Sequence, residues 1–106
     1  MLVYSYLTNN VLLGKRGEVV TTINDHNGTR EEAVILLQEA TKAETDTRVR
    51  AWVYLDGIPH YGIEILFNYQ SRLFEVISEK QDGFKGNETT AVKAIELAEK
   101  ILKDDL

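Results

Sequence analysis

Hydrophobic and polar positions alternate along three consecutive segments of the chain. In residues 47–55 every second position is apolar, and residues 61–67 and 72–79 repeat this pattern. A period of two is typical of a strand with one buried face. The Asp56-Gly57 pair favours a hairpin between the first two segments, and residues 68–71 supply turn residues before the third. These segments predict a three-stranded antiparallel meander.

Two further segments have the period of an amphipathic helix. Thr29 and Glu32 have the spacing of a capping box and predict a helix over residues 30–43. Apolar residues recur three and four positions apart in residues 91–102, which predicts a closing helix. We expect Asn87 to be its N-cap and residues 81–86 to be a loop. The alanines of this helix would let it approach a sheet closely.

The first 28 residues predict a β-hairpin or a kinked meander. Residues 2–7 and 18–23 are rich in β-branched and aromatic residues, which favours strands. We expect turns at residues 8–10 and 14–17, and a loop at residues 24–28. The chain is therefore expected to be a single α+β domain, 1–106, in the order ββαβββα. Both helices are expected to pack on one face of the sheet.

Composition supports a folded, acidic domain. A chain of 106 residues fits one core, and 43% hydrophobic residues exclude wholesale disorder. The net charge of −5 belongs mainly to residues 54–106, which hold six Lys or Arg against ten Asp or Glu. This charge argues against a general nucleic-acid binder. Cysteine is absent, which excludes disulfides, thiolate catalysis and Cys-ligated metal sites.

The sequence predicts a cytoplasmic location. Residues 1–10 lack the basic start and the apolar run of a secretory leader. No apolar stretch approaches the roughly 20 residues that are needed to cross a bilayer. We therefore expect no association with a membrane.

No group of residues has the pattern of a catalytic or metal site. His26 and His60 have no carboxylate at ligand spacing, so exposed turn residues are the simpler interpretation. Ser5, Ser71 and Ser78 lack the glycine-flanked setting of a serine nucleophile. The segment Gly14-Lys15-Arg16-Gly17 lacks the spacing of a phosphate-binding P-loop. We expect no enzymatic activity, no cofactor and no bound metal.

The positions of the meander that alternate with the apolar ones include the residues that we expect to contact a partner. If both helices cover the apolar phase, the opposite face presents aromatic, aliphatic and arginine side chains, a mixture typical of protein interfaces. The predicted partner-binding residues are Arg48, Arg50, Trp52, Tyr54, Leu66 and Ile77. Two alternatives stay open. The N-terminal strands could fold across this face, or a one-residue slip in register could exchange the two faces.

The segment Gly83-Phe84-Lys85-Gly86 precedes the alanine-rich closing helix, and residues 29–106 have the order helix, three strands, helix. In outline this resembles a double-stranded-RNA-binding domain, in which a glycine loop precedes the second helix. The resemblance implies RNA contacts by a lysine cluster at the start of that helix. Here the corresponding residues are Asn87, Glu88, Thr89 and Thr90, so no binding residue is carried over.

Three functions are favoured by these observations, ahead of a fourth, an enzyme that uses a borrowed metal or a composite dimer site. The leading hypothesis is a small acidic protein-interaction domain that self-associates or binds a protein partner through the exposed sheet face. The alternative is an acidic inhibitor or immunity-type protein that blocks the basic groove of a nucleic-acid enzyme. The third hypothesis is binding of double-stranded RNA, as the resemblance implies.

Overall fold

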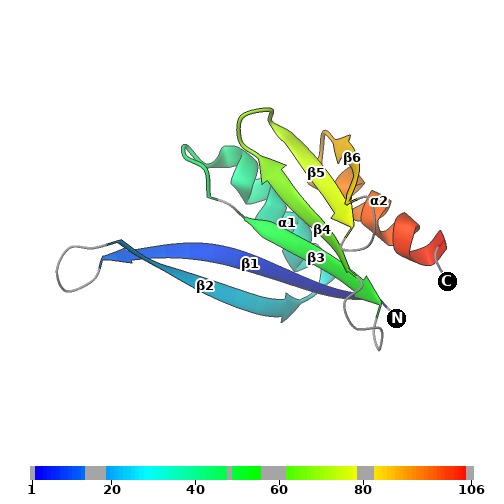
Figure 1. The fold of residues 1–106 in the computed structure, drawn as a ribbon, viewed down its shortest axis with the longest axis horizontal. Coiled ribbons are helices and arrows are strands. Elements are labelled where there is room, and N and C mark those ends of the chain that lie inside the picture. The colour runs from blue at the N-terminus through cyan, green and yellow to red at the C-terminus, as the bar shows by residue number, and fades with distance from the viewer. Residues whose placement is uncertain (1, 14–18, 48, 56–61, 79–82, 105–106) are drawn as a thin grey trace.

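Six antiparallel strands form one sheet, and both helices lie on the same face of it (Figure 1). The computed structural model describes residues 2–13, 19–47, 49–55, 62–78 and 83–104, and for residues 7–13 and 19–27 it describes the backbone. The elements are β1 (Leu2–Leu13), β2 (Val19–Gly28), α1 (Arg30–Lys42), β3 (Arg50–Leu55), β4 (Gly62–Asn68), β5 (Leu73–Ser78), β6 (Phe84–Glu88) and α2 (Ala91–Asp104). Across the sheet the strands are ordered β2-β1-β3-β4-β5-β6.

The predicted α+β class is confirmed, and so is the packing of both helices on one sheet face. Helix α1 begins after the expected capping box. The Glu32 N–H donates to Thr29 Oγ1 at 3.1 Å, and the Thr29 N–H donates to Glu32 Oε1 at 3.3 Å. Strands β3, β4 and β5 pair as the antiparallel meander that the alternation predicted.

The hairpin of β1 and β2 is longer than the sequence predicted. Residues 8–10 continue β1 and residues 24–28 continue β2, so the turn and the loop expected there are wrong. Cross-strand pairing runs from Tyr4↔Gly28 to Leu13↔Val19. Pairing of two backbones outweighs the local turn preference of asparagine. The turn expected at residues 14–17 lies outside the described residues.

A sixth strand occupies a segment that we expected to be a loop. Residues Phe84–Glu88 pair with β5, so the expected N-cap role of Asn87 is wrong. Thr90 has that role, because its Oγ1 accepts a hydrogen bond from the Lys93 N–H at 3.2 Å. Gly86 has a φ of 156°, which favours glycine, and a glycine inside a short segment weakens its strand signal.

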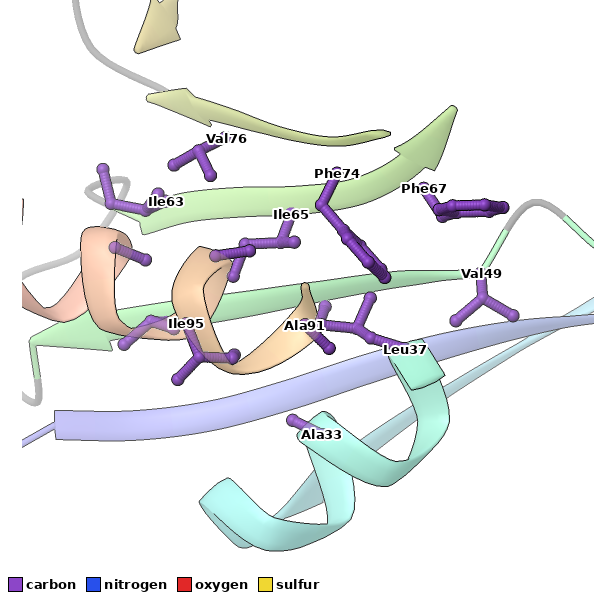
Figure 2. Packing of buried hydrophobic residues seen from close by; sticks show 14 of the residues in the cluster. Ala33, Leu37, Val49, Ile63, Ile65, Phe67, Phe74, Val76, Ala91 and Ile95 are labelled. Atoms are coloured by element: carbon purple, nitrogen blue, oxygen red, sulfur yellow. The ribbon is translucent and has the colours of Figure 1, made fainter. Parts of the chain in front are cut away.

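The hydrophobic core lies between the helices and the apolar phase of the meander (Figure 2). The rings of Phe67 and Phe74 pack with their centroids 5.0 Å apart. On α2, the buried residues Ala91, Ala94 and Ala98 carry small side chains that allow the close approach we expected. The largest fully buried side chains are Phe74, Leu37, Ile63, Ile65, Ile95, Leu102, Val53 and Val76.

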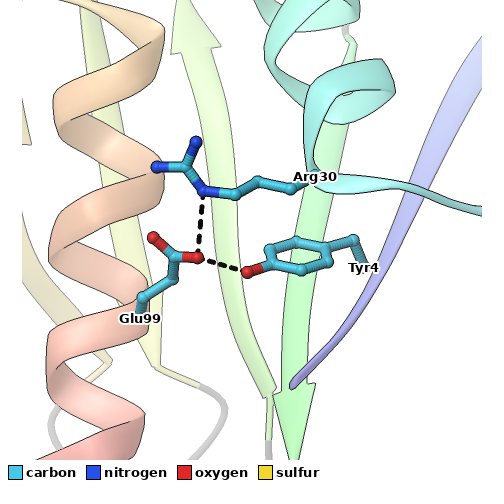
Figure 3. A network of polar contacts seen from close by, with 3 residues as sticks. All are labelled: Tyr4, Arg30 and Glu99. Atoms are coloured by element: carbon cyan, nitrogen blue, oxygen red, sulfur yellow. Dashed lines mark hydrogen bonds and ion pairs between the residues drawn. The ribbon is translucent and has the colours of Figure 1, made fainter. Parts of the chain in front are cut away.

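Polar contacts tie β1 to both helices. The Tyr4 hydroxyl donates to Glu99 Oε2 on α2, and Arg30 Nε on α1 donates to the same oxygen at 3.1 Å (Figure 3). The Tyr6 hydroxyl donates to Glu32 Oε2 at 2.9 Å. These tyrosines, which alternate along β1, also pack against the core. The helix side of β1 is thereby fixed, and its intervening residues belong to the opposite face of the sheet.

Candidate interaction surface

The sheet surface opposite the helices, called the open face below, is formed by alternate residues of each strand. Directly paired residues of neighbouring antiparallel strands point to the same side of the sheet. Both described helices lie on the other side (Figure 1). The register therefore gives four rows across the open face: Val3–Tyr54–Gly62, Ser5–Trp52–Glu64–Ile77, Arg50–Leu66–Glu75–Asn87 and Asn68–Leu73.

Trp52 and Tyr54 form the aromatic part of the open face. Both side chains are half-buried. Ser5, the residue opposite Trp52 on β1, is 2% exposed, and its hydroxyl donates to Tyr54 Oη at 3.3 Å. This bond fixes one side of the tyrosine in the free chain. Aromatic groups that are already positioned lose little conformational entropy when a partner binds.

An ion pair lies beside the tryptophan. Arg50 Nη1 on β3 is 3.5 Å from Glu64 Oε1 on β4, and the two side chains are 48% and 20% exposed. Such an exposed pair contributes only about 0–1 kcal/mol to stability. A guanidinium has five N–H donors, so Arg50 can also bind a carboxylate of a partner.

Aliphatic side chains extend the open face toward β6. Leu66, Leu73 and Ile77 are half-buried. Phe84 stands opposite Ile77 at the edge of the sheet and is 54% exposed. Among the described residues, Ile35 on α1 is the other large hydrophobic side chain that is mainly exposed. The open face thus combines two aromatic groups, an arginine and an apolar border.

A hollow of about 410 Å³ adjoins the open face where β3 begins and β4 ends. The Tyr69 hydroxyl donates to the carbonyl oxygen of Glu44 at 2.6 Å and holds one part of its wall. A hollow with charged and apolar walls suits a partner's side chain or a small amphipathic molecule. Its lining residues are Asp46, Val49, Arg50, Leu66, Phe67, Asn68, Tyr69 and Gln70.

The structure brings together five of the six residues that the sequence nominated for partner binding. The open face contains Arg50, Trp52, Tyr54, Leu66 and Ile77. Arg48 lies outside the described residues. The alternative in which the N-terminal strands fold across this face is wrong, because β1 pairs with β3 and continues the sheet at its edge.

Two residues at or beside the open face were missed by reasoning from the sequence. Phe84 was assigned to a loop, because the short β6 contains a glycine and little alternation. Ser5 was considered as a nucleophile, whereas it supports Tyr54. The strand alternation around Ser5 was a usable signal, since it places this residue in the phase opposite to Tyr4 and Tyr6.

The structure departs from the outline of a double-stranded-RNA-binding domain. Four strands, β3 to β6, stand between the helices, and the expected glycine loop is largely strand β6. Helix α2 starts after Asn87, Glu88, Thr89 and Thr90, none of which is basic.

Across the described ranges no group of three or more His, Cys, Asp or Glu side chains could hold a metal ion. His26 lies in β2 opposite Tyr6, and His60 lies outside the described residues. None of the helices that the structure describes is long and apolar enough to cross a membrane.

Comparisons with known proteins found no family model, no curated protein and no solved structure that matches this chain.

Proposed function

We propose that this chain is a non-enzymatic protein-interaction domain that binds a protein partner through its open face. The observation that carries the proposal is the grouping of Trp52, Tyr54 and Arg50 on a sheet face that neither helix covers. Trp, Tyr and Arg are the residues that most often dominate the binding energy of protein interfaces. Leu66 and Ile77 add apolar area beside them.

The chain contains its own probe for this contact. Trp52 is its single tryptophan and belongs to the open face. Burial of its half-exposed ring by a partner removes water from the indole and shifts the fluorescence emission to shorter wavelength. A titration against a captured partner, or a dilution series of the chain alone, distinguishes a second protein from self-association.

The test compares two variants. Trp52→Ser combined with Tyr54→Ser removes the aromatic part of the open face. Ile35→Ser, the matched control, removes a large exposed hydrophobic side chain from α1 instead. We expect the wild type and Ile35→Ser to bind the same second protein in pull-down experiments. The double variant should keep its circular dichroism spectrum and lose the complex.

Two outcomes would refute the proposal. If the double variant unfolds, Trp52 and Tyr54 act mainly in the core. If it folds and still forms the complex with unchanged affinity, the partner binds elsewhere.

A second candidate function rests on charge. Residues 54–106 hold ten acidic residues against six basic ones, and Glu64 and Glu75 belong to the open face. An acidic inhibitor of a basic nucleic-acid enzyme would use this charge to speed association. Titration with basic nucleases should then give binding that weakens steeply with added salt. Binding that is absent at low salt, or unchanged at high salt, would exclude this function.

A further inference from the structure

Strand β1 extends beyond the sheet to which it belongs. It pairs with β3 only from Leu2↔Leu55 to Leu7↔Arg50, whereas it pairs with β2 as far as Leu13↔Val19. Residues 8–13 of β1 and 19–24 of β2, called the ribbon below, therefore have no third strand beside them. Figure 1 shows the ribbon extending away from both helices and from the remaining strands.

Among the described residues the ribbon has two free edges: the outer edge of β2, which continues past Asp25, and the edge of β1 on the side of β3. Every second residue of a strand directs its main-chain N–H and C=O groups to one edge. In residues 8–13 the groups that point toward β3 have no strand beside them among the described residues, because β3 begins at Arg50. Such an edge is a template for another strand. It is six residues long, the typical length of a strand in a folded protein.

The sequence of the ribbon lacks the features that keep strand edges apart. Proteins protect free edges with lysine or other charges, with proline or with bulges. Residues 8–13 and 19–24 include no charged residue and no proline, although 27% of the chain is charged. Their pairing is also continuous from Thr8↔Asn24 to Leu13↔Val19. The paired segments that extend beyond β3 are therefore uncharged in an otherwise acidic chain.

A two-stranded ribbon is at best marginally stable in water, and a third strand adds hydrogen bonds and buried area. Half of the ribbon residues are apolar by sequence, namely Val11, Leu12, Leu13, Val19, Val20 and Ile23. Their position beyond β3 separates them from the core that the helices cover. The chain itself thus provides no second layer for this segment among its described residues.

We infer that the ribbon binds a second copy of this chain, with the free edges of the two β1 strands paired antiparallel across a two-fold axis that passes beside Asn10 or Val11. An antiparallel edge is complementary to itself, so one surface serves both copies. The absence of charge lets two chains of net charge −5 approach at this place. The result is a four-stranded sheet in the order β2-β1-β1-β2. The inference concerns a surface other than the open face and does not depend on the proposed function.

The free edge of β1 lies next to the start of β3. The added strand would lie in line with β3, beyond Arg50, on the side where Leu7 pairs with that residue. The hollow of about 410 Å³ is at the same place, since Val49 and Arg50 line it.

Disulfide trapping tests the inference, because the chain has no cysteine of its own. Asn10 and Val11 lie at the centre of the free edge, and the two-fold axis places one of them directly opposite its own copy. Directly opposite residues of two antiparallel strands have Cα atoms about 4.5–5.5 Å apart. Their partners across the ribbon are Thr22 and Thr21 on β2, which provide matched controls. The four variants are Asn10→Cys, Val11→Cys, Thr22→Cys and Thr21→Cys.

We expect the native protein to have twice the 12.0 kDa mass of the chain in sedimentation equilibrium. Under mild oxidation Asn10→Cys or Val11→Cys should form a covalent dimer, and Thr22→Cys and Thr21→Cys should form several-fold less. The Trp52→Ser, Tyr54→Ser pair, introduced into the Asn10→Cys and Val11→Cys variants, should leave this cross-linking unchanged. The inference is overturned by a monomer at high concentration, by a dimer that neither β1 variant traps, or by cross-links that favour β2. Loss of cross-linking in the Trp52→Ser, Tyr54→Ser background would also overturn it, because the copies would then join through the open face.

Discussion

Tyr4 on β1 and Glu99 on α2 are joined by a hydrogen bond between residues 95 positions apart in the chain. Arg30 on α1 donates to the same carboxylate oxygen, so one carboxylate connects the sheet with both helices (Figure 3). The Glu99 side chain is only 14% exposed. Burial, together with the hydrogen bond to Glu99, raises the pKa of the Tyr4 hydroxyl above its ordinary value of 10.0. The Tyr4 hydroxyl therefore keeps its proton near neutral pH and donates this hydrogen bond there.

Replacement of Tyr4 by Phe should destabilise the fold measurably. The change removes a hydrogen bond to a charged acceptor, which is worth about 1.5–3 kcal/mol. We expect the free energy of unfolding in urea to fall by about 2 kcal/mol. Tyr69→Phe is the matched control, because the Tyr69 hydroxyl donates to the neutral carbonyl oxygen of Glu44. Its effect should be about 1 kcal/mol or less. Equal effects of the two variants would contradict the role of the buried carboxylate.

The same contact should also produce a pH dependence in alkaline solution. A group whose pKa is raised on folding adds stability below its unfolded pKa, and that stability is lost as the pH rises through the folded pKa. For Tyr4 the loss begins above about pH 10. The stability difference between the wild type and Tyr4→Phe should therefore shrink as the pH rises above this value. Urea unfolding of both proteins on either side of it measures the change, and a constant difference would count against the assignment.

Glu32 should stabilise the fold at neutral pH and lose this contribution in acid, whereas Tyr4 loses its contribution in alkali. The hydrogen bond from Tyr6, and those from Thr29, lower the pKa of the Glu32 carboxyl below its ordinary 4.5. A lowered pKa gives stability that is present above the unfolded pKa and lost as the pH falls through the folded pKa. We expect the wild type to lose more stability below about pH 4.5 than Glu32→Gln does.

Glu31→Gln is the control for this experiment. Glu31 lies in the same first turn of α1, so its charge meets the same helix dipole. The structure shows the capping-box bonds at Glu32 instead. If the two variants alter the acid limb of the stability curve equally, the dipole rather than the hydrogen bonds sets the effect.

Local patterns determined the parts of this fold that could be predicted. The alternation around Trp52 and Ile65 specifies both a strand and a buried side, because one register slip would expose every apolar residue. The Thr29–Glu32 box specifies a helix start through hydrogen bonds within four residues. The candidate site followed from the same alternation, which assigned Arg50, Trp52, Tyr54, Leu66 and Ile77 to one face.

The remaining parts depend on neighbours that are distant in the sequence. Asn10 is in a strand because Thr22 pairs with it, and Phe84 is in a strand because Ile77 offers a free edge. Neither partner is visible from local propensity, which in both segments favours a turn. The link between Tyr4 and Glu99 is equally hidden, since it joins the first strand to the last helix.

Arg72 has a strained backbone conformation, and contacts of its side chain offset the cost of that strain. Its φ is 64°, in the left-handed region. Its guanidinium carbon lies 5.0 Å from the centroid of the Phe67 ring and 5.2 Å from that of Tyr69. Its Nη2 donates to the Thr41 carbonyl oxygen at 2.7 Å. These contacts connect the turn between β4 and β5 to the end of α1.

Two substitutions of Arg72 distinguish the cost of its backbone strain from the stabilisation by its side-chain contacts. Arg72→Ala removes the contacts and keeps the strain, so we expect a loss of about 1–2 kcal/mol. Arg72→Gly also removes the contacts but relieves the left-handed strain, so it should be more stable than Arg72→Ala by about 1 kcal/mol. Chemical denaturation of both variants provides the comparison. A glycine variant that is less stable than the alanine variant would show that strain is negligible here.

Enlargement of a buried alanine on α2 should disrupt the packing of that helix on the sheet. Ala94 has no exposed surface, and its neighbours in the core include fully buried side chains such as Ile63 and Ile95. A leucine has no space there, and forced overpacking of a core costs about 1–3 kcal/mol. Lys93→Leu places the same side chain one position earlier on the exposed side of the helix, where changes stay within about 0.5 kcal/mol. Thermal unfolding should therefore show a clearly lower midpoint for Ala94→Leu than for Lys93→Leu. Similar midpoints would mean that α2 can shift away from the sheet without loss, which the close packing of its alanines contradicts.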